Sequence, residues 1–260
     1  MAIPMFYKPS GSQLKLWKSL DRAQVRRREG LFLAEGFKIV DELLKSTWKV
    51  HALLVMEQKK TQWEAFLTEL AGKIELYGLT EAQWNKLSQD KNPEGMMAVA
   101  SPVRQHDISH LPEAGHILLL CGVNNPLNLG ALLRTAHWFG FGAVLLSGDA
   151  VDFTNPKVVR SSMGSLFHLT VIPDVDFHET LPKLKERYFL VASHKRNGVM
   201  PHPCSRRMAL LLGSESHGLP ENLLELAEET WSIPGAGGAE SLSLPQAAAI
   251  MMYEASRRSA

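Results

Sequence analysis

The hydrophobic positions divide the chain into a front part of short elements and a rear part with a stronger rhythm. In the front part the pattern predicts three helices and three strands, at Gln13–Arg28, Gly36–Lys45 and Thr61–Ala71 and at Leu31–Ala34, Val50–Met56 and Met96–Ala100. The stretch Ser101–Gly115 mixes Pro, Asp, Ser and Gly, which is typical of a linker. We therefore expect a domain at residues 1–102, a linker at 103–115 and a second domain at 116–260.

The rear part alternates buried-type strands with helical segments. The predicted strands are Ile117–Val123, Ala143–Leu146, Leu166–Ile172, Phe189–Ala192, Ala209–Leu212 and Thr230–Ile233. A helix is expected through Ala131–Phe139, and a last helix from Leu244 to about Arg257 carries an apolar face suited to a core or a subunit interface. Strands alternating with helices indicate an α/β fold with a parallel sheet covered on both faces.

Composition narrows the class of protein. The chain has 260 residues, of which 45% are hydrophobic and 21% charged, an ordinary globular balance. Its two cysteines suit a reducing compartment. No apolar run approaches the roughly 18 residues of a membrane helix, and the first residues lack the layout of a signal peptide. We expect a cytoplasmic protein without a membrane partner.

Charge is concentrated near the front of the chain. The net charge is +1, yet Lys8 to Arg28 holds seven basic residues and one acid, Asp21. This basic arm carries +6, so the remaining chain sums to −5. Such a stretch is able to contact phosphates. By charge alone, however, a solvated helix face is the favoured interpretation.

Several catalytic signatures fail. A nucleophile elbow needs glycine where Ser214 stands. The glycine-rich stretch 235–240 lacks the third glycine of a dinucleotide fingerprint, which argues against a nicotinamide-dependent oxidoreductase. His194, His202 and Cys204 match no zinc spacing, so no metal site is predicted.

Three segments that follow predicted strands share the features of a site. The first contains Asn128, at an expected helix cap, with Gly130 and Arg134 after it. The second runs from Leu210 to Pro220 and the third from Ile233 to Pro245, where Ser241 or Ser243 is an expected cap. Taken singly, the first segment is equally well explained by an ordinary cap and an ion-paired arginine. The second has an ordinary glycine turn as its alternative, and the third an ordinary serine cap.

Together the three segments closely resemble the signature motifs of the SpoU methyltransferases, a branch of the SPOUT superfamily. The family motifs are N-x-G-x-x-x-R, G-x-E-x-x-G, and I-P followed by S-L-N before the last helix. The matching residues here are Asn128, Gly130 and Arg134, then Gly213, Glu215 and Gly218, then Ile233, Pro234, Ser241 and Leu242. The order of the motifs and their spacing agree as well.

The front of the chain is similar to the family's substrate-binding domain, which resembles ribosomal protein L30e. The matching residues include Arg26-Arg-Arg-Glu29-Gly-Leu-Phe32-Leu-Ala-Glu35-Gly36 and Pro93-Glu-Gly95-Met-Met-Ala98-Val. This resemblance changes the interpretation of the basic arm, and RNA contacts are now expected from Arg22, Arg26, Arg27 and Arg28.

The resemblance implies a smaller α/β L30e-like domain followed by a parallel-sheet SPOUT domain with a deep trefoil knot, which periodicity cannot reveal. It implies a homodimer formed through the C-terminal domain, S-adenosylmethionine as cofactor and RNA as partner. The implied cofactor-binding residues are Leu212, Gly213, Glu215, Gly218, Ile233, Pro234 and Leu242. The implied catalytic residues are Arg134, Asn128, Glu215, Ser241 and Ser243.

The implied reaction is attack of a ribose 2′-hydroxyl on the sulfonium methyl group. Because a guanidinium stays charged in proteins, we hypothesise that Arg134 chiefly stabilises the developing alkoxide or a bound phosphate. Ribosomal RNA is favoured over transfer RNA because the front stretch is more typical of ribosomal RNA enzymes. Ser243 replaces the usual asparagine and His217 the usual arginine. These departures keep open a second hypothesis, a degenerate member that holds RNA as an assembly factor without transferring methyl groups.

Overall fold

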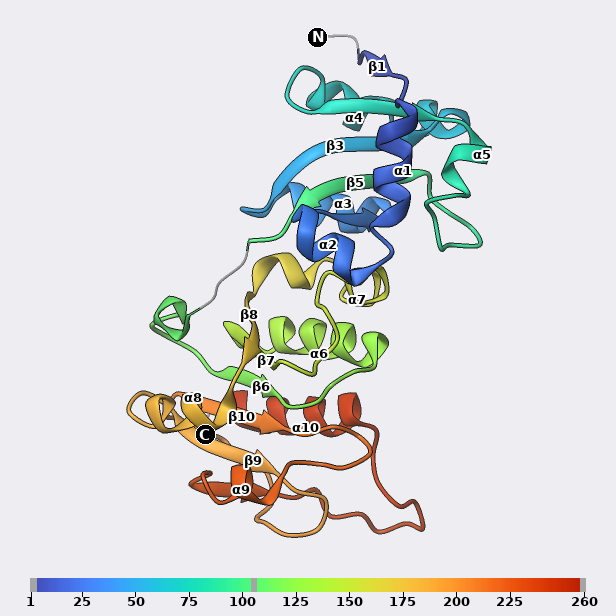
Figure 1. Cartoon of the computed structure of the whole chain (residues 1–260). Coiled ribbons are helices and arrows are strands. Elements are labelled where there is room, and N and C mark those ends of the chain that lie inside the picture. Colours follow the sequence, from blue (N-terminus) through green and yellow to red (C-terminus); the bar gives the residue numbers. More distant parts are fainter. Residues whose placement is uncertain (1–3, 104–106, 258–260) are drawn as a thin grey trace. The chain divides into compact units, whose positions relative to one another are not determined.

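The computed structural model describes residues 4–103 and 107–257, which form two compact units (Figure 1). The first unit holds the described residues up to Val103 together with Thr154–Phe167. The second holds the described residues from 107 to Phe153 and those from His168 onward. A segment from the middle of the chain therefore belongs to the first unit. The expected division at residues 102 and 116 did not assign any later segment to the first domain. As limits of functional domains, these boundaries stay a prediction.

The first unit is built on a mixed sheet. Its elements are β1 (Phe6–Tyr7), α1 (Gly11–Ser19), α2 (Ala23–Glu29), β2 (Phe32–Glu35), α3 (Phe37–Leu44), β3 (Lys49–Met56), η1 (Glu57–Trp63), α4 (Glu64–Leu70), β4 (Glu75–Leu79), α5 (Glu81–Trp84), β5 (Met96–Ser101) and α7 (Pro156–Ser161). Among the described residues the strand order is β1-β4-β3-β5-β2, with β5 antiparallel to both β3 and β2. The strand β4 was not predicted from the sequence.

The basic arm forms two helices where the sequence predicts one. A capping box on Ser10 begins α1, and the chain leaves the helix after Ser19. The Arg26 guanidinium donates hydrogen bonds to the carbonyl oxygens of Leu20 and Asp21, at 2.9 and 2.8 Å. An unbroken helix would use these carbonyls for its own backbone bonds. Arg26 therefore stabilises the break between α1 and α2.

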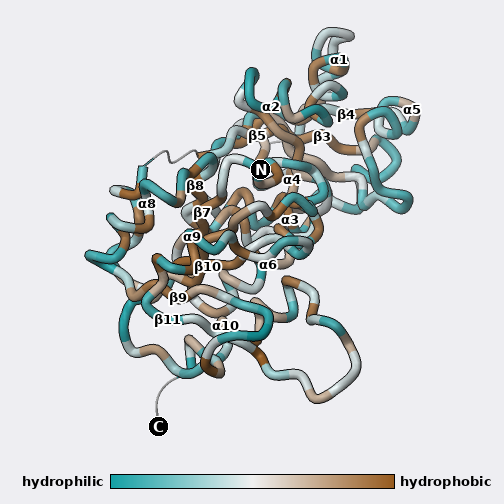
Figure 2. Tube along the Cα trace, turned by 60° about the horizontal axis from the view of Figure 1, so that its bottom comes forward, coloured by the Kyte–Doolittle hydropathy of each residue, from teal (hydrophilic) through white to brown (hydrophobic). Residues whose placement is uncertain are grey.

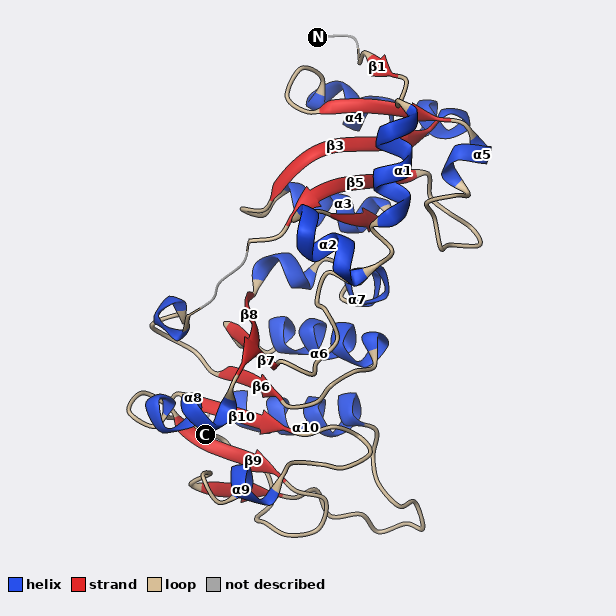
Figure 3. Ribbon diagram, viewed as in Figure 1, coloured by secondary structure: helices blue, strands red, loops and turns tan. Residues whose placement is uncertain are grey.

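The second unit is built on a parallel sheet, as predicted. Its elements are η2 (Ile108–His110), β6 (Ile117–Leu120), α6 (Pro126–Trp138), β7 (Ala143–Ser147), β8 (Thr170–Val175), α8 (Phe177–Leu184), β9 (Phe189–Ser193), β10 (Met208–Leu212), α9 (Glu221–Leu224), β11 (Glu229–Trp231) and α10 (Leu244–Ser256) (Figure 3). The short helix η3 (Ser165–His168) belongs to the first unit except for its last residue. The strand order is β11-β9-β10-β6-β7-β8, and neighbouring strands in this order pair in parallel. The knot itself stays a prediction.

Alternate residues of these strands point to opposite faces of the sheet, because side chains along a strand alternate. One face, which includes Ile117, Leu119 and Leu211, packs against Phe177 and Leu181 of α8. The intervening residues are also buried and leave the other face for α6 and α10, which pack against each other. The hydropathy colouring shows hydrophobic residues along the central strands of this sheet, such as β7 and β10 (Figure 2).

Two predicted boundaries differ most from the structure. The strand expected at Leu166–Ile172 begins only at Thr170, since Ser165–His168 forms a 3-10 turn. The helix expected from Ala131 begins at Pro126, whose fixed φ suits a first helical position. No helix in the described part of the chain is long and apolar enough to cross a membrane.

Candidate active site

The C-terminal ends of β6, β7 and β10 meet at one edge of the parallel sheet. There the Cys121 amide donates to the Leu212 carbonyl at 2.9 Å, and the Gly122 amide donates to Ser147 Oγ at 2.8 Å. Loops that follow parallel strands at such an edge form the usual ligand-binding crevice of α/β folds. The first and second motifs therefore begin side by side.

The first motif enters α6 through a cap that sequence reasoning missed. Asn125 is the N-cap, and its side-chain oxygen accepts from the amides of Leu127 and Asn128 at 2.9 and 3.4 Å. The expectation that Asn128 caps the helix is wrong, because Asn128 lies within the first turn. The pair Asn125-Pro126 carries the recognisable signal, a cap residue followed by proline at the first helical position. The Asn128 side chain is thus not used for capping and is half-buried.

Arg134 lies on α6 and is exposed. Within the described residues it makes no ion pair and no side-chain hydrogen bond. Its helix packs against α10, the helix that follows the third motif. A guanidinium without a protein partner is available to bind a phosphate or a developing negative charge.

The second motif forms a tight turn after β10. The Gly218 amide donates to the Ser214 carbonyl at 2.9 Å, and Gly218 has a left-handed φ of 69°. Gly213 is buried, and a Cβ there would overlap the carbonyl group of Gly218. Both glycines are therefore required for this loop to fold back on itself.

Glu215 joins the second motif to the third. Its Oε1 accepts a hydrogen bond from the backbone amide of Leu244, the first residue of α10, at 3.3 Å. Ser243 is the N-cap residue of α10, as one of the two alternatives expected, although its hydroxyl makes no capping hydrogen bond. A carboxylate at a helix N-terminus satisfies a free amide and interacts favourably with the helix dipole. Glu215 therefore acts as the cap of α10 from another loop.

The third motif lies in an exposed loop between β11 and α10. Ser241, Ser243 and Pro234 are exposed, Leu242 is 46% exposed, and Ile233 is half-buried. Glu240 in the same loop pairs with Lys195, which follows β9, at 2.6 Å. This hydrogen bond and the lysine charge lower the pKa of Glu240 below its ordinary value. The ion pair tethers the loop to the neighbouring strand end.

A polar cluster beside this edge was not singled out from the sequence. Ser147 donates to Asp149 Oδ1 at 2.5 Å while it accepts from Gly122. Burial, together with the nearby Asp149 charge, raises the pKa of the Cys121 thiol, so this thiol stays protonated. The cluster fixes the loop after β6. No spacing of residues in the sequence predicts this cluster.

The basic arm divides into exposed and buried residues. Arg22, Arg27 and Arg28 are exposed, and Arg28 pairs with its neighbour Glu29 at 2.7 Å. Arg26 is only 1% exposed and also donates to Thr154 Oγ1 at 3.2 Å. The expectation that Arg26 contacts RNA is therefore wrong in this conformation, because its donors serve the backbone and Thr154.

No group of three or more metal-ligating side chains gathers within residues 4–103 and 107–257. The three residues weighed as ligands have other contacts. His194 accepts from two following backbone amides, His202 contacts Glu229 at 2.7 Å, and Cys204 donates to the Arg206 carbonyl.

Family comparisons agree with both parts of the chain. Residues 115–253 match the SpoU rRNA Methylase family, and residues 11–98 match the MRM3-like substrate binding domain. The 23S rRNA (guanosine(2553)-2′-O)-methyltransferase RlmP of Bacillus subtilis is 31% identical, over 93% of this chain and 94% of that protein. The 23S rRNA (uridine(2479)-2′-O)-methyltransferase of Streptomyces viridochromogenes is 27% identical, over 95% and 90%.

Solved structures of similar proteins cover nearly the whole chain. The SpoU methyltransferase AviRb from Streptomyces viridochromogenes, in complex with AdoMet, has a TM-score of 0.86 and 26% identity, covering 95% of this chain and 97% of that one. An AdoMet-bound rRNA methyltransferase from Sinorhizobium meliloti has a TM-score of 0.81 and 27% identity, covering 96% of each chain. With its three motifs meeting at one sheet edge, the chain belongs to the SpoU rRNA methylase family.

Proposed function

We propose that this protein transfers the methyl group of S-adenosylmethionine to a ribose 2′-hydroxyl of ribosomal RNA. The observation that carries the proposal is the hydrogen bond from the Leu244 amide to Glu215, which holds the second motif against the start of the helix after the third. The named relatives that act on 23S ribosomal RNA support this substrate over transfer RNA. Ribosomal RNA as substrate also makes the cytoplasm the proposed location.

The loops fit the proposed cofactor. Leu242 and Ile233 offer apolar surface for an adenine ring. Pro234 follows Ile233 directly, and Leu212 is the last residue of β10. Gly213 lets the backbone at Gly218 pack closely against it, and the exposed Gly218 leaves its own backbone groups unshielded by a side chain. When bound, S-adenosylmethionine supplies an electrophilic methyl group on a sulfonium centre.

This chain's own residues would orient the attacking ribose. The hydroxyl oxygen forms a bond to the methyl carbon, the carbon–sulfur bond breaks, and the hydroxyl proton leaves to solvent or a base. Arg134, exposed and without a protein partner among the described residues, stabilises the negative charge that develops on this oxygen or holds the adjacent phosphate. Asn128 and Ser241 are the proposed positioning residues for the RNA.

The apolar surface of the second unit supports the proposed homodimer. Leu127 and Trp138 on α6 are 58% and 83% exposed, and Ile250 and Tyr253 on α10 are 40% and 51% exposed. Four large apolar side chains on two helices that pack together mark an interaction surface. Light scattering of the purified protein tests this, since a monomer at micromolar concentration would contradict it.

The function is tested in two steps. Calorimetric titration with S-adenosylmethionine and S-adenosylhomocysteine should show micromolar binding of both. Radiolabelled methyl transfer should then reach unmodified 23S ribosomal RNA and not unmodified transfer RNA. Binding of RNA without binding of either cofactor compound, even with the RNA present, would instead support the assembly-factor hypothesis that Ser243 motivates.

A further inference from the structure

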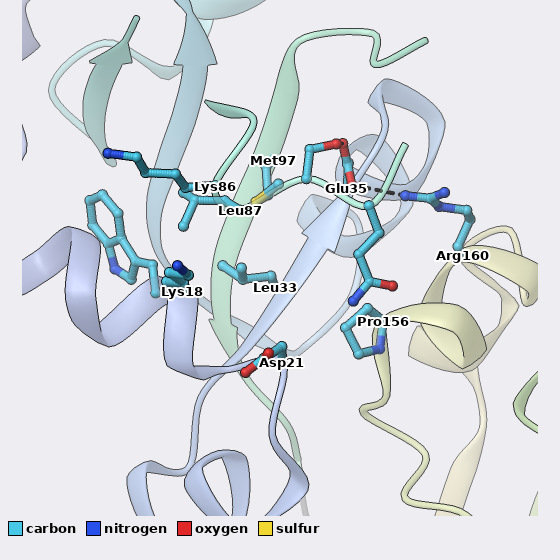
Figure 4. Close-up of a pocket in the computed structure, with 12 residues that line it drawn as sticks. Lys18, Asp21, Leu33, Glu35, Lys86, Leu87, Met97, Pro156 and Arg160 are labelled. Carbon is cyan, nitrogen blue, oxygen red and sulfur yellow. Dashed lines mark hydrogen bonds and ion pairs between the residues drawn. The ribbon is translucent and has the colours of Figure 1, made fainter. Parts of the chain in front are cut away.

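The first unit contains a cavity of about 140 Å³, and none of the residues that line it belongs to the three motifs (Figure 4). It lies between α1, the edge strand β2, the segment after α5, and α7. Leu33, Met97 and Trp17 contribute apolar surface and are 7%, 1% and 4% exposed. The cavity thus has a fixed apolar floor.

One wall of the cavity is a polar network. Arg160 on α7 pairs with Glu35 at 2.9 Å and with Asp90 at 3.5 Å. Ser88 donates to the other carboxylate oxygen of Glu35. The Glu35 side chain is only 12% exposed, and each of its oxygens retains a further lone pair. A carboxylate held from both sides is a preorganised acceptor for N–H groups of a ligand.

Two free ammonium groups complete the lining. Lys18 and Lys86 are exposed, and among the described residues neither makes an ion pair or a side-chain hydrogen bond. With Arg160 they give three cations against Asp21 and Glu35, a net charge of +1. Figure 4 shows Lys18 and Lys86 on the side of the cavity away from the Glu35–Arg160 pair. Lysines arranged in this way suit a backbone phosphate.

The size of the cavity selects among occupants. Sites for drug-sized ligands begin at about 300 Å³, so this cavity admits one base-sized group. Proteins read RNA largely through unpaired bases that stack on side chains, and a base pair within a duplex has no such free face. A buried apolar floor, an acceptor wall and a cationic rim match the base, its polar edge and its phosphate.

We infer that this cavity binds one unpaired nucleotide of the RNA substrate, with the base on Leu33 and Met97 and the phosphate on Lys18 and Lys86. The inference rests on the proposed function in that the RNA is the methylated substrate. It adds that Arg160 and Pro156, which lie outside residues 11–98, complete the RNA-reading surface of the first unit.

The first test uses the four ribonucleoside monophosphates as probes on the full-length protein. The Met97 methyl signal, assigned with Met97→Leu, is followed by NMR. At least one monophosphate should shift this signal saturably, and Lys86→Glu should weaken that binding at least fivefold. Absence of a saturable shift with all four, or an equal shift in Lys86→Glu, would overturn the inference.

The second test measures affinity for unmodified 23S ribosomal RNA over a salt series. Lys86→Glu should weaken binding about tenfold and lower the slope of log K against log salt by about 1, as expected for a lost phosphate contact. Lys73→Glu is the matched control, an exposed lysine outside the cavity, and should stay within about twofold of the wild type.

The two tests separate this inference from the proposed function. If the wild type methylates RNA while Lys86→Glu behaves like Lys73→Glu, the cavity is not a nucleotide site and the function stands. If the wild type transfers no methyl group but a monophosphate still shifts Met97 and requires Lys86, the proposed function fails and the nucleotide site stands. Unchanged S-adenosylmethionine affinity in both variants excludes a general folding defect.

Discussion

Two helices, α2 in the first unit and α6 in the second, each carry an arginine that the sequence analysis selected for function. Arg26 on α2 is buried and donates to two backbone carbonyls and Thr154, whereas Arg134 on α6 is exposed and makes no such contact among the described residues. The same side chain is therefore a structural element in one unit and an available cation in the other. The hydrogen-bond partners of each arginine decide between these roles, and the charge pattern of the sequence does not reveal those partners.

The largest expected effect follows from changing the exposed arginine. Arg134→Lys keeps the charge but loses the planar, forked donor geometry, so methyl transfer under saturating RNA should fall about 10²- to 10³-fold. Stability and cofactor affinity should not change. Lys185→Ala, at an exposed cation at the end of α8, is the control and should retain full turnover. Full turnover in Arg134→Lys would remove Arg134 from the catalytic role.

The buried arginine should show the reverse pattern. Arg26→Met leaves the Leu20 and Asp21 carbonyls and Thr154 without this donor and should lower the free energy of unfolding by about 3 kcal/mol, measured by urea denaturation. Arg27→Met, at the exposed neighbour, should change it by less than about 0.5 kcal/mol. Equal free energies of unfolding for the two variants would contradict the structural role of Arg26, and with it the difference between α2 and α6.

A smaller effect is expected where a charge from one loop caps a helix from another. Glu215→Ala removes the acceptor of the Leu244 amide and should weaken S-adenosylmethionine binding about tenfold, which corresponds to about 1.4 kcal/mol. The helix-capping contribution to stability itself should be about 0.3–1 kcal/mol. Glu225→Ala, at an exposed carboxylate just after α9, serves as control. Wild-type cofactor affinity in Glu215→Ala would show that the contact between the loops is not needed.

The smallest effect concerns a charged side chain that has a partner but lies at the surface. Hydrogen bonding to the Pro203 carbonyl, and then to Glu229, raises the pKa of His202 above its ordinary value of 6.5. Because the folded value exceeds the unfolded one, the stabilisation is complete below pH 6.5 and is lost as the pH rises through the raised folded value.

Solvent screening should keep the His202 contribution below about 0.5 kcal/mol, because the side chain is 47% exposed. The wild type should therefore exceed His202→Asn in melting temperature by slightly more at pH 6 than at pH 8.5. An excess that is larger at pH 8.5 would have the opposite sign and contradict the assignment. A charged side chain with a partner thus contributes little to stability unless the pair is also buried, as it is for Arg26.

The second unit was largely predictable from its sequence because buried parallel strands leave continuous apolar runs. The motif loops follow those runs directly, so Arg134, Gly213 and Gly218 were located without the structure. The Glu215 cap was not predictable, because it joins residues 29 positions apart through the fold. The Asn125 cap was predictable in principle from the proline after it, and the expectation placed on Asn128 overlooked that signal.

The first unit was harder to predict for two physical reasons. Charged residues look alike in a sequence whether they are solvated or buried, so nothing distinguished Arg26 from Arg27. Long-range pairing also escapes local patterns, and neither Arg160 with Glu35 nor Thr154 with Arg26 leaves a trace in the spacing of residues. The cavity depends on both kinds of information and became visible only in three dimensions.

The placement of Thr154–Phe167 in the first unit has a consequence for synthesis on the ribosome. Phe32 and Trp48 of that unit pack against Phe167, so their apolar surface stays open until residue 167 has left the exit tunnel. At about 5–20 residues per second, the delay after residue 103 amounts to several seconds. The first unit is therefore not able to complete its folding until after β6 and β7 of the second unit have emerged. A nascent-chain binder that shields Phe32 should be released only once Phe167 has emerged.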